Sequence, residues 1–372
     1  MQNDKHNPTI SVVVPVYNVA PYVERCLQSV MRQTYPATEC ILVDDASSDD
    51  SIERCQRLIT GYSGPTKFVI LHHSSNRGLS ASRNTGTDAA ISSYIYYLDS
   101  DDEMTPDCLE KLMAPILEDD SIEMVMGGSR KDYSQMSGLL SRLKQWIRVR
   151  QTEARRNHDK VLLELNNNEE VYKWYYCSKN RRSNYEWNKL LKLSFVKENL
   201  LYDREGLILE DRLWNFYLLR CLNHAVIIPD VTYIYYQRSS SIIMGSGSQK
   251  KREHRGRIFR EMAENIIPGE RLEETENRLW GFCRNYIDAS DNPDYQYAYE
   301  AFLRQMSDGH HKSSVRQLKR AHRLAKSRFR RALYKSLHNK KLRILFNSRL
   351  RKFRNETHCC PLKNQNSSLK LL

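Results

Sequence analysis

The sequence predicts an α/β protein in which a mainly parallel β-sheet is flanked by helices and followed by a helical, strongly basic C-terminal appendage. Over the first 130 residues, short β-branched runs alternate with segments of helical spacing. Strands that are joined by helical crossovers form parallel sheets buried on both faces. The segment 312–354 contains 17 Lys and Arg and no Asp or Glu. The positive charge is therefore a property of the tail and not of the α/β part.

Five runs of β-branched or aromatic residues predict the strands of this sheet. They are 10–14, 40–43, 68–71, 94–98 and 124–126. Apolar residues that recur every three or four positions predict helices between them, over 21–32, 50–61 and 79–91 and after 105. Asp50 with Glu53 suggests a capping box for the second helix, and Thr105 with Pro106 suggests the start of the fourth. Further along, we expect helices over 188–193 and up to 222, and a pair of strands within 225–236.

The chain divides by pattern into three parts. Residues 1–243 form the expected α/β domain, and the less regular stretch 131–183, rich in Arg, Asn and Tyr, is an insertion in it. Residues 244–355 are expected to be helical and basic, and residues 356–372 to form a disordered tail.

The composition excludes several classes of protein. The mean hydropathy is −0.67, and no apolar run of about 18 residues occurs, so we expect no membrane-spanning helix. The first residues lack the apolar core of a signal peptide. The nine cysteines are odd in number and include no C-x-x-C pair, which argues against a disulfide framework or a zinc site. We therefore expect a cytoplasmic protein.

Three carboxylates follow the fourth strand, in the sequence Asp99-Ser-Asp-Asp102. Their mutual repulsion predicts a compensating positive charge, and a hard divalent cation, Mn²⁺ or Mg²⁺, favours such oxygen ligands. We expect this acidic cluster to hold the metal. The alternative is a solvated acidic turn that caps the next helix.

Other polar side chains follow the first two strands and enter the third helix. Asp45 could accept a hydrogen bond from a nucleobase, with the Tyr17 ring packed beside the base; the alternative is that Asp45 caps the next helix. Arg83 lies in the first turns of the helix that follows Gly78 and could reach a base or a phosphate. The alternative is an ordinary exposed arginine.

Glu210 and Asp211 precede the amphipathic segment 213–222. Either could act as a general base that takes a proton from a hydroxyl group. The alternative is that negative charge at a helix N-terminus only stabilises that helix.

Taken together, these segments resemble the family 2 glycosyltransferases, which have the GT-A fold, a Rossmann-like α/β architecture. The resemblance is specific over 10–130 and weaker over 187–243. The matching segments are 10–18 (ISVVVPVYN), 27–34 (LQSVMRQT), 42–47 (LVDDAS), 76–84 (NRGLSASRN), 97–102 (YLDSDD), 187–190 (WNKL), 210–211 (ED) and 235–242 (YYQRSSSI).

The resemblance implies a metal-dependent transfer of one sugar from a nucleotide-sugar, usually a UDP-sugar, with inversion at the anomeric carbon. The Gln-x-x-Arg-Trp motif of the processive synthases is absent, which favours a single addition. The acceptor would be a saccharide or a lipid-linked saccharide of cell-surface polysaccharide assembly. The resemblance also implies residue roles. The nucleotide would be lined by Pro15, Tyr17, Asp45 and Arg83, and Arg238 would approach its phosphates. Asp99 would contact the ribose or the metal, Asp101 would bind the metal, and Asp211 would be the base, with Glu210 as the alternative.

The basic tail combines a spaced apolar stripe with Lys and Arg on its other faces. Such a helix can lie in an anionic membrane interface, which would place the enzyme peripherally on the inner face of the membrane, near a polyprenyl-diphosphate-linked acceptor. The alternative is that the stripe packs on the rest of the chain.

Three other function classes are less consistent with the sequence. A nucleic-acid-binding protein would explain the basic tail but not the N-terminal motifs, and so no nucleic acid is expected as a partner. A catalytically inactive scaffold on the same fold is disfavoured because Asp99, Asp101 and Asp211 are all present. A dinucleotide-binding oxidoreductase is disfavoured because no G-x-G-x-x-G follows the first strand.

Overall fold

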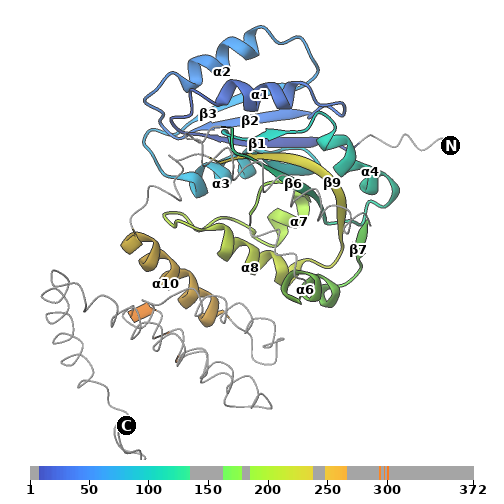
Figure 1. The fold of residues 1–372 in the computed structure, drawn as a ribbon, viewed down its shortest axis with the longest axis vertical. Coiled ribbons are helices and arrows are strands. Elements are labelled where there is room, and N and C mark those ends of the chain that lie inside the picture. The colour runs from blue at the N-terminus through green and yellow to red at the C-terminus, as the bar shows by residue number, and fades with distance from the viewer. Residues whose placement is uncertain are drawn as a thin grey trace, which may run out of the picture. The chain divides into compact units, whose positions relative to one another are not determined.

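The structure is a computed structural model that describes residues 8–134, 162–177, 185–237 and 248–265, together with residues 293, 294, 297 and 300. By its contacts the chain divides into two units, Met1–Glu274 and Thr275–Leu372. All the elements described below belong to the first unit (Figure 1).

The strands are β1 (Ile10–Val16), β2 (Glu39–Asp44), β3 (Lys67–His72), β4 (Tyr94–Tyr97), β5 (Glu103–Met104), β6 (Met124–Asp132), β7 (Leu163–Leu165), β8 (Lys189–Lys192) and β9 (Ala225–Tyr236). The helices are α1 (Val23–Met31), α2 (Ser51–Thr60), α3 (Leu79–Ala89), α4 (Cys108–Glu118), α6 (Asn168–Cys177), α7 (Leu193–Glu198), α8 (Asp211–Cys221) and α10 (Ser248–Glu264).

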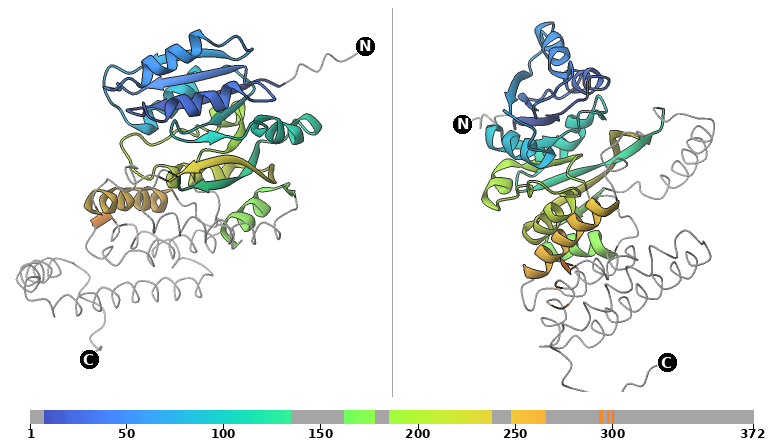
Figure 2. Two further views of the ribbon diagram at one scale, coloured as in Figure 1. Left: turned by 45° about the horizontal axis from the view of Figure 1, so that its top comes forward. Right: turned by 90° about the vertical axis from the view of Figure 1, so that its left-hand side faces the viewer.

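These strands form one mixed sheet in the order β3-β2-β1-β4-β8-β6-β9-β5, with β7 paired to β9. The β3-β2-β1-β4 half is parallel, as is the long pairing of β6 with β9 (Figure 2). The predicted mainly parallel α/β fold is therefore confirmed. The five strands predicted within residues 10–126 are also confirmed, as β1, β2, β3, β4 and β6. Because β1, β2 and β4 run in one direction, their carboxyl ends lie at the same edge of the sheet, where ligands of such sheets bind.

The segment 188–193 is a strand, and the prediction of a helix there is wrong. β8 inserts between β4 and β6 and is antiparallel to both. Leu190 and Leu191 are fully buried on opposite faces of the sheet, each in a different apolar cluster. A short apolar run has no period that distinguishes a strand buried on both faces from a helix. Here the segment is a strand because the edges of β4 and β6 need a hydrogen-bonding partner between them.

Three smaller expectations are also corrected. Residues 225–236 form one long strand, β9, and not a pair of strands. The side chain of Asp50 makes no capping hydrogen bond to α2; the Ser51 amide donates instead to Asp49 Oδ1 at 3.1 Å. The fourth helix begins at Cys108, two residues after Pro106. The expected irregular insertion 131–183 contributes the end of β6, β7 and α6 among its described residues.

Apolar residues alternate between the two faces of the sheet and build a three-layer core. Val12 and Val14 of β1 belong to one buried cluster with residues of α1, α2 and α4. Val13 of β1 belongs to the other cluster, with residues of α6, α7 and α8. The third helix, α3, packs on this second face, where a Cβ on Gly86 would lie 2.2 Å from a methyl group of Val13. Figure 1 shows α1 and α2 on the side of the sheet opposite to α3.

Helix α10 packs on α8. The Tyr217 hydroxyl of α8 donates to Glu261 of α10 at 3.1 Å, and the Ile208 amide, just before α8, donates to His254 of α10 at 2.8 Å. Among the helices that the structure describes, none is both long and apolar enough to cross a bilayer. The predicted boundary at 243/244 stays a prediction, and the segments 312–354 and 356–372 lie outside the described residues.

Candidate active site

The loops after β1 and β2 lie together at the carboxyl edge of the sheet. Pro15 is buried within β1, and Tyr17, just beyond it, has 47% of its surface exposed. Asn18 joins the two loops, because its side-chain oxygen accepts from the Ser48 amide at 2.8 Å. An exposed ring beside a rigid pair of loops fits the role expected for Tyr17.

Asp45 organises the loop that enters α3. Its Oδ1 accepts from the Arg77 amide at 2.8 Å and lies 2.7 Å from His73 Nδ1, and its Oδ2 accepts from the Gly78 amide at 2.7 Å. Gly78 has φ +91°, a conformation that glycine adopts at little cost. Asp45 does not cap α2, and one acceptor position on Oδ2 is left after these bonds, because each carboxylate oxygen can accept two.

Arg83 is the centre of a buried ionic cluster. Only 5% of its side chain is exposed, and it approaches four carboxylates. They are Asp99 (2.8 Å), Glu186 (3.3 Å), Glu210 (3.3 Å) and Asp203 (3.7 Å). The alternative of an ordinary exposed arginine is therefore wrong. The guanidinium joins segments that are far apart in sequence, because its planar fork offers several donors at once.

Burial in this cluster favours the neutral forms of its acids. The pKa of Asp203 and that of Glu210 are each raised to about 7, mainly by burial, although the charge of Arg83 opposes the rise. Burial also raises the pKa of Glu186 well above its ordinary value. Near neutral pH the cluster therefore retains protons that exposed carboxyl groups would have lost.

Asp211 lies beside this cluster but is not one of the ion-pair partners of Arg83. Burial raises its pKa, and its Oδ1 is buried without a hydrogen-bond partner among the described residues. Glu210, in contrast, contacts Arg83 directly. Lys189 is also buried nearby; burial lowers its pKa to about 7, and the charges of Glu186 and Asp211 oppose this effect.

The carboxylates of Asp99, Asp101 and Asp102 each offer an oxygen within 4.8 Å of the others. Asp102 is fully buried and is used structurally, because it accepts from the Tyr233 hydroxyl and the Tyr236 amide, both at 2.8 Å. These acids do not cap α4, which has Asp107 at its N-cap position. Such an oxygen-only donor set could hold a hard divalent cation.

Arg25 of α1 holds this acidic loop in place. Its guanidinium donates to the Asp101 carbonyl oxygen at 2.6 Å and pairs with Glu103 at 2.9 Å. It also lies 3.5 Å from the centre of the Tyr236 ring. The loop between β4 and β5 is thus fixed between α1 and β9.

The structure brings most of the expected site residues together. Asp99 and Glu210 meet on Arg83, Asp101 lies in the acidic cluster with Asp99, and Asp211 follows Glu210. Arg238 lies outside the described residues. Sequence reasoning did not identify Glu186, Asp203, His73, Lys189 or Arg25 as site residues. Lys189 lies within the matching segment 187–190, and Glu186 directly precedes that segment. The other three are common residue types that belong to none of the motifs identified in the sequence.

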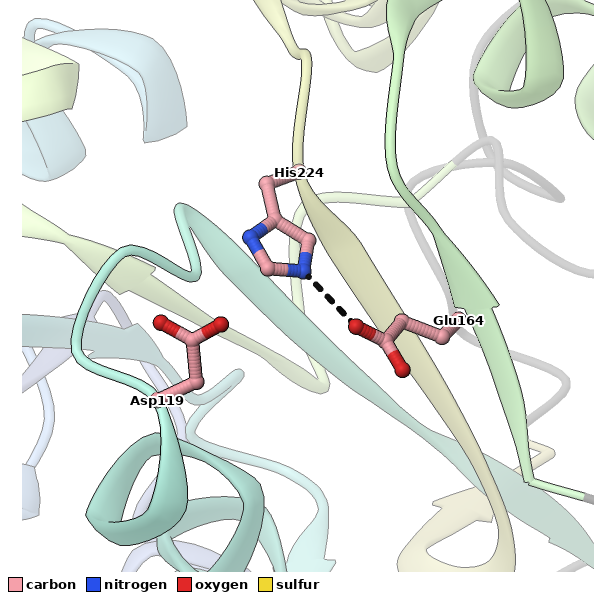
Figure 3. Close-up of side chains that lie close together, drawn as sticks. All are labelled: Asp119, Glu164 and His224. Carbon is pink, nitrogen blue, oxygen red and sulfur yellow. Dashed lines mark hydrogen bonds and ion pairs between the residues drawn. The ribbon is translucent and has the colours of Figure 1, made fainter.

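A second group of possible metal ligands lies elsewhere in the fold. Figure 3 shows Asp119 after α4, Glu164 on β7 and His224 just before β9, with His224 Nε2 3.2 Å from Glu164 Oε1. The Ser121 hydroxyl lies 3.0 Å from His224 Nδ1. Both acids are exposed, and these contacts account for the histidine without an ion.

Comparisons with known proteins agree with this geometry. Residues 11–186 match the model of the family described as glycosyl transferase family 2. The uncharacterized glycosyltransferase EpsJ of Bacillus subtilis (strain 168) is 29% identical over 236 residues, which are 63% of each chain. The uncharacterized glycosyltransferase YibD of Escherichia coli (strain K12) is 37% identical over 111 residues, 30% of this chain and 31% of the relative. The matches thus span less than two thirds of these relatives.

Two solved structures share the fold at low sequence identity. TarS 1–349 of S. aureus, in complex with UDP-GlcNAc, has a TM-score of 0.62 and 18% identity, covering 87% of this chain and 92% of its own. The mannosyltransferase PcManGT from Pyrobaculum calidifontis, in complex with GDP-Man and Mn²⁺, has a TM-score of 0.53 and 16% identity, covering 86% and 81%. Residues 11–186 thus carry a glycosyl transferase family 2 domain, and the fold is GT-A.

Proposed function

We propose that this chain transfers one sugar from a nucleotide-sugar to a hydroxyl group of a saccharide or lipid-linked saccharide, in a metal-dependent reaction that inverts the anomeric carbon. One observation carries the proposal. Arg83 bonds Asp99, which belongs to the acidic cluster with Asp101, and also Glu210, which adjoins Asp211. The acidic cluster that we assign to the metal and diphosphate, and the neighbour of the residue that we assign as base, thus contact the same arginine.

The donor would lie across the loops after β1, β2 and β4. Tyr17 offers a ring and Asp45 an acceptor position to the nucleobase, and Pro15 lines the same loop. UDP is the nucleotide favoured by the family resemblance, and TarS was solved with UDP-GlcNAc, whereas PcManGT was solved with GDP-Man. A divalent metal on Asp101 and Asp99, when bound, would neutralise the charge of the diphosphate leaving group.

Transfer then needs only one proton acceptor. Asp211 would take the proton of the acceptor hydroxyl, whose oxygen forms a bond to C1 while the bond from C1 to the diphosphate oxygen breaks. The electron pair of the broken bond leaves with the diphosphate. The raised pKa of Asp211 suits a general base, because such groups work best when their pKa lies near the working pH. Glu210 is the second candidate, but its contact with Arg83 occupies it.

Two substitutions test this assignment with UDP-GlcNAc as the probe donor. Asp101→Ala should abolish the Mn²⁺-dependent part of UDP binding, measured by calorimetry, whereas Asp119→Ala in the second acidic group should leave it unchanged. Asp211→Asn should keep UDP binding and lose sugar transfer. Unchanged Mn²⁺ dependence in Asp101→Ala would contradict the metal assignment, and transfer near the wild-type rate in Asp211→Asn would move the base to Glu210.

We also propose that the basic segment 312–354 holds the enzyme peripherally at an anionic membrane surface, on the cytoplasmic side. Its 17 Lys and Arg without any acid support this, since each basic residue near such a surface adds about 1 kcal/mol. Salt-sensitive co-sedimentation with anionic vesicles is expected. Equal binding to RNA, or none to vesicles, would contradict this location.

A further inference from the structure

Four aromatic side chains form a continuous band beside the candidate active site. The Trp187 ring stacks on Tyr233, with centroids 4.3 Å apart, and on Tyr185, at 4.6 Å. Tyr235 adds a fourth ring, 5.6 Å from Trp187 and 6.2 Å from Tyr185. In each of these four ring pairs the angle between the ring planes is 30° or less, so the rings lie nearly parallel.

The band connects the acidic loop with the candidate base. At one end, the Tyr233 hydroxyl donates to Asp102 and accepts from the Asp99 amide at 3.4 Å. At the other end, burial and then the negative charge of Asp211 raise the pKa of Tyr185, as expected for a phenol near that carboxylate. Glu186, which lies between Tyr185 and Trp187 in the sequence, approaches Arg83 Nη1 at 3.3 Å, and the same nitrogen lies 3.3 Å from Glu210, the neighbour of Asp211. The band therefore runs from the metal-binding side of the site to its base.

The two kinds of ring in the band differ in exposure. Tyr233 is fully buried and Trp187 nearly so, at 0% and 7%. Tyr185 and Tyr235 are only half-buried. The inner pair belongs to an apolar cluster against which the outer pair packs from outside. Because a partly exposed ring forgoes part of the stabilisation that burial gives, Tyr185 and Tyr235 keep some apolar surface that the core does not use.

We infer that Tyr185 and Tyr235 form the acceptor subsite and bind a pyranose ring of a saccharide acceptor through its apolar C–H face. This inference rests on the proposed function. In a single displacement, the acceptor oxygen approaches C1 from the side opposite to the diphosphate and within reach of Asp211. An acceptor placed there lies between the acidic loop and the base, which is where the band lies. Ligand sites combine aromatic walls with a few polar groups in this way.

Tyr185→Leu tests the subsite, and Tyr185→Phe is the matched control that keeps the ring and loses the hydroxyl. UDP-GlcNAc serves as donor, methyl pyranosides as acceptor probes, and open-chain ribitol as a probe without a sugar ring. In Tyr185→Leu the KM for the pyranosides should rise about three- to tenfold, the range that aromatic contacts give. The KM for ribitol, the rate of UDP-GlcNAc hydrolysis and the Kd of UDP should stay within about twofold of wild type. Tyr185→Phe, which keeps the ring, should retain the wild-type KM for the pyranosides.

Three results would overturn the subsite. The first is an unchanged KM for pyranosides in Tyr185→Leu, and the second is an equal rise in the KM for ribitol. The third is a wild-type enzyme that hydrolyses UDP-GlcNAc but transfers the sugar to no pyranoside. Tyr235→Leu provides a second variant if Tyr185→Leu loses its near-ultraviolet circular dichroism. Failure of the proposed function is distinguishable, because the wild-type protein would then neither bind UDP with Mn²⁺ nor hydrolyse the donor.

Discussion

Replacing Arg83 with Met should destabilise the protein strongly and in a pH-dependent way. The substitution keeps the length of the apolar stem but removes a cation that approaches four carboxylates within 4.0 Å. Two of these, Glu186 and Asp203, have side chains that are only 1% exposed. Water therefore cannot replace the lost guanidinium, and uncompensated negative charge stays in the interior.

The magnitude follows from this burial. Removing one partner of a buried ion pair costs about 3–5 kcal/mol, which for a domain of this size lowers Tm by about 6–20 °C. The affected carboxyl groups can relieve the cost by binding protons, because the pKa of Asp203 and that of Glu210 already lie at about 7. Losing Arg83 raises both pKa values further above those of the unfolded chain. Because the wild-type groups also keep their protons below about pH 7, the extra penalty of Arg83→Met is small below that pH and grows as the pH rises from there toward the higher folded pKa of the variant.

Thermal unfolding followed by near-ultraviolet circular dichroism at pH 5 and pH 8 measures this effect. Arg77→Met is the matched control, because Arg77 precedes the same helix but forms an exposed pair with Glu205, with side chains 48% and 45% exposed. Such a pair contributes at most about 1 kcal/mol. A loss of Tm in Arg83→Met that equals the loss in Arg77→Met, or that is the same at both pH values, would refute the reasoning.

Two further substitutions concern residues that neighbour the proposed base and the proposed metal site. Lys189→Met removes a buried cation that lowers the pKa of Asp211, so this pKa should rise. The acidic limb of the kcat–pH profile should then move to higher pH. An unmoved limb would exclude an electrostatic interaction between Lys189 and the base. Arg25→Met removes the hydrogen bond to the Asp101 carbonyl oxygen. The Kd of Mn²⁺ should rise by roughly tenfold, because one charged hydrogen bond has about this effect. Electron paramagnetic resonance with UDP present measures this Kd. Arg54→Met, which breaks exposed ion pairs on α2, is its control, and an equal change in both would contradict the positioning role.

The parallel half of the sheet could be predicted because its strands are short β-branched runs, separated by helices with a clear apolar stripe. The segment 188–193 could not, because Leu190 and Leu191 satisfy a helix and a fully buried strand equally well. Its strand form depends on β4 and β6, which lie far away in sequence. Likewise, no local feature of the sequence indicates that 225–236 continues through Pro229 as a single strand. The strand is continuous because it pairs with β6 over most of its length.

The site was predictable where a carboxylate follows a strand directly, as for Asp45 and Asp99. It was not where the partner comes from a distant segment. Glu186 and Asp203 are isolated acids in the sequence, and only the fold gathers them around Arg83. The exact use of Asp45 was also hidden, because its bonds to the loop before α3 depend on backbone amides that carry no residue-specific signal.

The late position of β8 in the chain has a consequence for biosynthesis. β4 is complete at Tyr97, but its neighbour β8 ends only at Lys192. At about 5–20 residues per second on the ribosome, the edge of β4 waits several seconds for its partner. During this time the apolar Tyr94–Tyr97 segment is an open template for pairing with other nascent chains. Helper proteins that shield emerging strands should therefore matter more for the yield of this enzyme than for one whose sheet is assembled in sequence order.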